Sequence, residues 1–133
     1  MKKVFLVLIV AFALQSCSEK VGKDAVANTN WVLTEWPGET MPVTEKKATL
    51  SFGNDNQVSG KSFCNGFGGN AKIEGNTIKF GELMGTMMFC EDVGQAEGRY
   101  NEGLRNTDSF KVAGGKLQLF QNGKLLMVFS KAK

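Results

Sequence analysis

The chain has 133 residues, enough for one domain, and its 42% hydrophobic and 22% charged residues are ordinary for a globular protein. It contains no histidine, which excludes Ser-His-Asp and Cys-His catalysis and also zinc sites that need a histidine ligand. Its formal net charge is +3, without a basic stripe or zinc finger, so we expect no nucleic-acid partner, no metal and no cofactor.

Residues 1–16 carry the features of a targeting segment. Lys2 and Lys3 precede an unbroken apolar run from Val4 to Leu14. This run is shorter than the roughly 20 apolar residues that span a membrane, so it predicts a secretory signal peptide. A buried N-terminal helix or strand is the alternative, which the lack of a polar face disfavours. Cleavage would remove both lysines and lower the formal charge from +3 to +1.

The apolar run ends in the sequence LQSC, Leu14 to Cys17, which resembles the lipobox of bacterial lipoproteins. The resemblance implies that residues 1–16 are a lipoprotein signal peptide and that Cys17 is lipidated, which anchors the protein in the cell envelope. Ser18 is not the aspartate that retains lipoproteins in the inner membrane, so we expect the outer membrane. Ordinary secretion, with Cys17 as a free thiol, is the alternative.

The mature chain is expected to begin with a tether, residues 17–29, followed by one domain, residues 30–133. The tether is polar and has no apolar period. The alternation of Asn30–Trp36 predicts the first strand of the domain, which Pro37 and Gly38 end.

Short alternating segments separated by turn residues then predict a series of antiparallel strands. The expected strands are Lys47–Phe52, Gln57–Phe63, Ala71–Glu74, Thr77–Phe80 and Gly81–Phe89. Between the second and the third, the sequence NGFGGN at residues 65–70 is expected to form a turn. Its glycines Gly66, Gly68 and Gly69 can adopt the positive φ angles that a turn needs.

The segment from Glu91 to Asn106 predicts the one helix of the domain. An apolar stripe recurs there near the period of 3.6 residues, formed by Val93, Ala96 or Glu97, Tyr100 and Leu104. Glu91 and Asp92 in the first turn and Arg105 in the last turn would complement the helix dipole.

Three further strands are expected between Ser109 and Lys131, separated by Gly114-Gly115 and by Asn122-Gly123, a strong hairpin signal. The apolar residues expected to face the core here are Leu117, Leu119, Leu126 and Val128. Together the elements predict an α+β fold. It would be mainly antiparallel β, a curved sheet or a small barrel, with one α-helix packed on it.

Three roles are open for Cys64 and Cys90: a disulfide, two free thiols, or a ligand or nucleophile. Export places them in an oxidising compartment in which disulfides persist, so we predict a disulfide between them. It would close a loop of roughly 27 residues and stabilise the fold by about 3–4 kcal/mol. The competing role for the glycine-rich turn beside Cys64 is a nest of backbone N–H groups that binds an anion.

Several short motifs match, in order, the pattern of the META domain. They are WVL at Trp31–Leu33, GKSFCNGFGG at Gly60–Gly69, TMMFC at Thr86–Cys90, EGRY at Glu97–Tyr100 and KLQLF at Lys116–Phe120. Over Asn30–Phe129 the chain resembles this family, which includes the heat-inducible HslJ-like envelope proteins. It departs from the pattern at Phe63, where glycine is frequent, and at Phe89, where a small residue is common.

The resemblance implies a mainly antiparallel β fold with one helix, a place in the bacterial envelope, and a link to heat or antibiotic tolerance. It implies no catalytic residues. The motif residues would have structural roles instead: Trp31 as a core anchor, Asn65 and Gly66 as turn formers, and Thr86 and Met88 as packing residues of a strand.

Three functions remain open. The first is a monomeric, lipid-anchored, non-enzymatic envelope protein that acts in envelope stress by binding an envelope protein. The second is a hydrolase or transferase that uses carboxylates, for which the candidates are Glu35, Glu82, Glu91 and Asp92. The third is a carrier of a small apolar ligand in a barrel interior lined by Phe and Met side chains. The lack of a catalytic constellation in the sequence favours the first.

Overall fold

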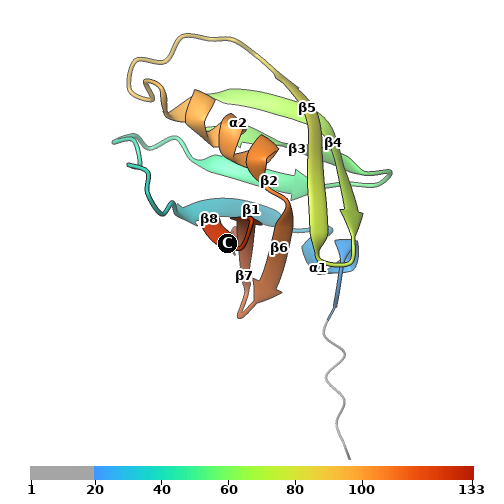
Figure 1. The fold of residues 1–133 in the computed structure, drawn as a ribbon. Coiled ribbons are helices and arrows are strands. Elements are labelled where there is room, and N and C mark those ends of the chain that lie inside the picture. Colours follow the sequence, from blue (N-terminus) through green and yellow to red (C-terminus); the bar gives the residue numbers. More distant parts are fainter. Residues whose placement is uncertain (1–19) are drawn as a thin grey trace, which may run out of the picture.

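The computed structural model describes residues 20–133, so the predicted signal peptide 1–16 and the predicted lipidation site Cys17 lie outside the described residues. The described part contains eight strands and two helices (Figure 1). The strands are β1 Asn30–Glu35, β2 Ala48–Phe52, β3 Gln57–Ser62, β4 Asn65–Glu74, β5 Thr77–Gly85, β6 Ser109–Ala113, β7 Lys116–Gln121 and β8 Lys124–Lys131. The helices are α1 Lys23–Val26 and α2 Ala96–Asn106.

The eight strands form a closed antiparallel barrel in chain order, so the predicted fold class is confirmed. Closure comes from β1 and β8, which pair with Leu33 opposite Phe129. The weakest seam lies between β5 and β6, which are paired only at Thr77 and Ser109. Helix α2 lies between these two strands in the sequence, and it packs against β3 and β5 (Figure 1).

The barrel interior is filled by side chains, with Tyr100 of α2 at the centre of an aromatic cluster. Its ring lies 6.0–6.5 Å, centroid to centroid, from the rings of Trp36, Phe63, Phe67 and Phe129. The predicted apolar stripe of the helix is buried: Val93, Ala96, Tyr100 and Leu104. Helix α2 is therefore held by packing, as expected for a helix with several glycines.

The helix begins five residues later than predicted. Residues 91–95 form turns, and Gly94 has a φ of +57°, which a right-handed helix cannot contain. Asp92 therefore lies outside the first helical turn and does not act on the helix dipole. Its carboxylate instead accepts hydrogen bonds from Lys46, at 2.7 and 2.8 Å, and from Thr44 at 2.5 Å.

The glycine-rich segment is a strand and not a turn, so that prediction was wrong. The chain reverses at Phe63 and Cys64, where Phe63 itself has a φ of 66°, and β4 starts at Asn65. None of the glycines at 66, 68 and 69 has a positive φ. At Gly69 the glycine is needed for close approach, because a Cβ there would overlap the carbonyl oxygen of Glu82 in β5.

The segment Gly81–Phe89 is a strand only as far as Gly85. The register pairs Gly85 with Phe67, and β4 begins two residues earlier at Asn65, so almost no partner remains for a longer β5. Thr86 and Met88, predicted to pack within a strand, therefore lie in a loop. The apolar character of this segment favoured a strand, whereas pairing decides where the strand ends.

The register of the last hairpin also differs from the prediction. A bulge between Leu119 and Phe120 shifts the pairing by one residue. Met127, opposite Leu119, is fully buried in the interior, whereas the predicted core residue Leu126 is only half-buried. Leu119 is buried in the core as predicted. Val128 is also buried, but it lies opposite Gln118 and is not part of the core cluster, which takes Met127 and Phe129 from β8.

The folded domain begins before residue 30. Val26 of α1 is fully buried, and its carbonyl accepts a hydrogen bond of 3.1 Å from the indole N–H of Trp31. Ala27 forms a bridge with Phe52. Residues 23–29, expected in the tether, are therefore part of the domain. A single buried valine within a polar segment gave too little periodicity to reveal this.

Candidate functional site

Cys64 and Cys90 form a disulfide, with their Cα atoms 6.4 Å apart. The bond ties the tight turn between β3 and β4 to the chain just before α2. A link of this span removes enough unfolded-state entropy to stabilise the fold by about 3–4 kcal/mol. Its position also fixes one end of the loop that follows β5.

The side chain of Asn65 holds the same loop at Thr86 and Met88. Its Oδ1 accepts hydrogen bonds of 2.8 Å from the Thr86 hydroxyl and from the Met88 backbone N–H, and its Nδ2 donates to the Met88 carbonyl at 3.0 Å. Asn65 is only 5% exposed. A buried amide that satisfies both its donor and its acceptor in this way fixes the path of the backbone it contacts.

The loop that these two restraints hold consists of Thr86–Phe89, and we call it the methionine loop. Its apolar side chains lie in water: Met87 is 97%, Met88 61% and Phe89 93% exposed. Met84 at the end of β5 is exposed as well. Contiguous exposed apolar residues of this kind mark interaction sites in soluble proteins.

A cleft of about 490 Å³ opens beneath the methionine loop, between the end of β5 and helix α2. Phe67 and Leu83 provide apolar lining, and Gly98 of α2 leaves open space on the helix side. Ser62 donates a 2.5 Å hydrogen bond to the Asn101 side chain at the polar end of the cleft. The cleft thus combines apolar walls with few polar groups, as binding sites do.

Two acidic side chains lie beside the methionine loop. Glu91 directly follows Cys90 of the disulfide, and Glu97 lines the cleft; the three ion pairs of the described residues include neither of them. Two nearby cations are paired, Lys46 with Asp92 at 2.7 Å and Arg99 with Glu39 at 2.8 Å, whereas Lys61, opposite Gly66 on β3, is in none of the ion pairs of the described residues. Glu97 is the one charged residue that lines the cleft.

The pKa of the Asp92 carboxyl is lowered, because Lys46 and then Thr44 donate hydrogen bonds to its charged form. This carboxylate serves to hold the loop around Lys46 against the turn after the disulfide. Asp92 is therefore already occupied and is not available as a proton donor at neutral pH.

The candidate catalytic carboxylates are dispersed. Glu35 lies at the end of β1, Glu82 on β5, and Asp92 is paired with Lys46. None of these three, and not Glu91, lines the cleft beneath the methionine loop. Within residues 20–133, no group of three or more His, Cys, Asp or Glu side chains is arranged to hold a metal ion, and no helix is long and apolar enough to span a membrane.

The structure gives different positions and contacts to the motif residues identified from the sequence. Trp31 is fully buried in the core, Asn65 contacts the methionine loop, and Gly66 accepts a 3.0 Å hydrogen bond from the Thr86 backbone N–H. Thr86 and Met88 contact Asn65 instead of packing in a strand. Sequence reasoning missed Asn101, whose only signal was a polar residue one position after Tyr100.

Comparisons with known proteins agree with this architecture. A protein from Burkholderia xenovorans, solved by NMR, has 25% identity and a TM-score of 0.68, covering 81% of this chain and 84% of its own. A DUF4847 family protein from Bacteroides vulgatus, solved by crystallography, has 16% identity and a TM-score of 0.61, covering 79% and 93%. No curated protein matches the sequence. The META domain family matches residues 24–133, nearly the whole described chain, and the chain therefore belongs to the META domain family.

Proposed function

We propose that this protein is a lipid-anchored, non-enzymatic envelope protein that uses the methionine loop to bind a protein partner during envelope stress. The observation that carries the proposal is that Met87 and Phe89 are 97% and 93% exposed on a loop that is held in place. The lipid anchor at Cys17 and the role in stress rest on the lipobox and on the family resemblance.

The disulfide and the Asn65 hydrogen bonds, which together we call the clamp, argue that the apolar surface of the methionine loop is exposed for a function. A disulfide and the three hydrogen bonds of the Asn65 side chain, one donated and two accepted, keep the loop in one place, although its side chains would be more stable away from water. Fixing a loop before binding lowers the entropy cost of binding. A held apolar loop beside a cleft is therefore suited to docking.

The partner that fits this surface is a basic amphipathic segment of another protein. Methionine side chains adapt to varied apolar surfaces, which suits contact with the apolar face of a helix. Glu91 and Glu97, which are in none of the ion pairs of the described residues, would attract lysine or arginine on the polar face of that helix.

The position of the loop favours a protein over the anchoring membrane. Figure 1 shows α1, the first element after Cys17 in the chain, at the opposite end of the barrel from the loop between β5 and α2. A protein anchored through Cys17 would therefore point the methionine loop away from the bilayer that holds it.

A peptide titration tests the docking surface directly. The probe is a fluorescent helical peptide of leucine and lysine, measured by anisotropy against the full chain in detergent. The double variant Met87→Ser with Phe89→Ser is expected to weaken binding about tenfold or more, because two anchoring apolar contacts are lost. Val43→Ser is the matched control, since Val43 is 96% exposed in another loop.

The same variants are then tested in cells that lack the native gene. The double variant should fail to restore survival of heat or antibiotic stress, whereas Val43→Ser should restore it. Equal peptide binding by both variants, full rescue by the double variant, or preferential binding of the loop to anionic vesicles would contradict the proposal.

A further inference from the structure

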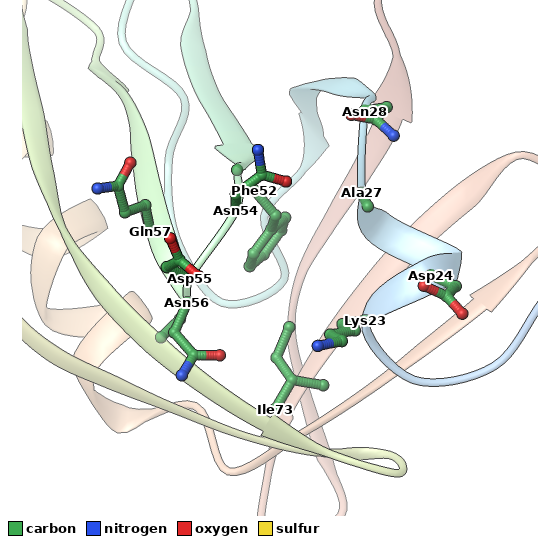
Figure 2. Close-up of a pocket in the computed structure, with 12 residues that line it drawn as sticks. Lys23, Asp24, Ala27, Asn28, Phe52, Asn54, Asp55, Asn56, Gln57 and Ile73 are labelled. Atoms are coloured by element: carbon green, nitrogen blue, oxygen red, sulfur yellow. The ribbon is translucent and has the colours of Figure 1, made fainter.

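We propose that the opposite end of the barrel carries a second binding site, which takes a neutral saccharide. A pocket of about 700 Å³ opens there between α1, the β2–β3 turn and β4 (Figure 2). It is built from segments that are distant in sequence, residues 23–28, 52–57 and 71–73. The site is separate from the methionine loop and does not depend on the proposed partner.

The floor of this pocket is apolar. Figure 2 shows Phe52 and Ile73 directed into the same space, and Ala71 completes the floor. Phe52 is braced from behind by Phe80, with ring centroids 6.3 Å apart, and is only 7% exposed. The floor of the pocket is therefore a narrow apolar strip and not a broad apolar surface.

The rim of the pocket is rich in carboxamide side chains. Asn54 and Asn56 come from the β2–β3 turn, Gln57 is the first residue of β3, and Asn28 comes from the segment after α1. Each carboxamide can donate and accept hydrogen bonds at the same time. A ligand that fits this rim must offer both donors and acceptors.

These amides are not used to hold the turn together. The turn is closed by backbone hydrogen bonds, from Gln57 N–H to the Asn54 carbonyl at 3.1 Å and from Gly53 N–H to the Gln57 carbonyl at 2.9 Å. The Asn56 carbonyl accepts from Ala71 N–H at 2.8 Å. Among the described residues, the side chains of Asn54, Asn56 and Gln57 make no hydrogen bond.

The backbone of the rim is fixed in an uncommon conformation. Asn28, Asp55 and Asn56 have φ angles of 55°, 55° and 61°, so three of the five non-glycine residues with positive φ in the described chain line this one pocket. Turn chemistry explains why Asn and Asp stand there, because they tolerate this region best. The three residues come from two separate segments of the chain that border the same pocket.

The charge of the pocket excludes strongly ionic ligands. One lysine, Lys23, extends into the space, and two acids, Asp24 and Asp55, lie on the rim, with Asp24 directed away from the centre in Figure 2. A phosphate or nucleotide site would need more positive charge, and a cation site would not include a lysine. A sugar ring fits, because it presents an apolar C–H face and a rim of hydroxyl groups.

Two sources could supply such a sugar in a bacterial envelope: a cell-wall glycan strand and the glycan of a membrane lipid. We would therefore titrate the ¹⁵N-labelled full chain, in a detergent without a sugar headgroup, with two neutral probes. N,N′-diacetylchitobiose stands for the cell-wall glycan strand, and the neutral hexose disaccharide lactose stands for the glycan of a membrane lipid. The readout is the NMR shift of the side-chain amide groups of Asn54, Asn56 and Gln57.

We expect saturable shifts confined to this pocket with one of the probes, at a Kd of about 1 mM or tighter. The variant Asn54→Ala with Gln57→Ala should weaken binding about tenfold, whereas Gln118→Ala on β7 should leave it unchanged. Both changes lie at sites that are not fully buried, so the spectra will report an intact fold. Absence of saturable shifts with both probes, or equal binding by the double variant, would overturn the proposal.

Discussion

Asn65 determines where the methionine loop lies. From the sequence, an asparagine between a cysteine and a glycine indicated a turn, and it does follow a reversal of the chain. What it does there could not be predicted, because its partners Thr86 and Met88 are more than twenty positions away. A polar side chain identifies a hydrogen-bonding group, whereas only the three-dimensional register identifies the partner.

Tyr100 is the chain's only tyrosine and is fully buried, with its hydroxyl donating to the Thr49 carbonyl at 2.9 Å. Burial disfavours the phenolate and raises the pKa of Tyr100 above its ordinary value of 10.0. Below pH 10 both the folded and the unfolded chain keep this proton. Above pH 10 the unfolded chain loses it first, so stability should fall by up to about 1.4 kcal/mol per pH unit from this group.

The measurement is denaturant unfolding between pH 8 and pH 11 or so, with phenolate absorbance followed in the same samples. Phenolate should appear only together with unfolding. Tyr100→Phe should flatten the alkaline fall, at a cost of about 1 kcal/mol at neutral pH for the lost hydrogen bond. Phenolate formation in a chain that keeps its native tryptophan fluorescence would show that the phenol is accessible to water.

At the scale of elements, the glycines of the chain have two distinct effects. Gly98 lies within α2, and a Cβ added there would meet nothing within 4 Å. Gly69 lies in β4, where a Cβ would overlap the backbone oxygen of Glu82 in the neighbouring strand. The sequence shows only that both are glycine; which one is replaceable depends on what lies opposite.

Gly98→Ala should therefore raise the free energy of unfolding by about 0.5–1 kcal/mol, since alanine favours helix over glycine. Gly69→Ala should lower it by about 1–3 kcal/mol, because neither backbone can yield without shifting the strand pair. Urea unfolding of both variants checks this. Stabilisation by Gly69→Ala, or loss of stability in Gly98→Ala, would contradict the packing of β4, β5 and α2 described above.

An element could be predicted from the sequence where its turn residues and its apolar alternation agreed with the strand pairing of the fold. Hairpins such as β4–β5 and β7–β8 were found because Gly75-Asn76 and Asn122-Gly123 are strong turn signals between alternating segments. The end of β5 and the start of α2 were misplaced. The apolar segment after β5 predicted a strand, but it is an exposed loop held by the disulfide and Asn65, and sequence periodicity does not encode such contacts.

For the molecule as a whole, the antiparallel fold with one packed helix followed from short strands joined by tight turns. Closure of the barrel depends on pairing between β1 and β8, at the two ends of the domain, which no local pattern reveals. The candidate site was predicted in part: the two cysteines and Asn65 were identified, but the exposed loop they hold was placed in a strand.

The result of this arrangement is a rigid barrel with two separate exposed features, the methionine loop at one end and the amide-lined pocket at the other. The two proposed sites share no lining residue, so we expect them to act independently.

Hydrogen exchange at the Met88 amide tests most directly whether the methionine loop is held in place. This N–H donates to Asn65 Oδ1 at 2.8 Å although its side chain is exposed, whereas the structure gives the neighbouring Met87 amide no hydrogen bond. In the oxidised protein the Met88 amide should exchange far more slowly than that of Met87, and Asn65→Ala should abolish the difference. Equally fast exchange of both amides in the unaltered protein, or continued protection of Met88 in Asn65→Ala, would contradict the clamp and the docking surface built on it.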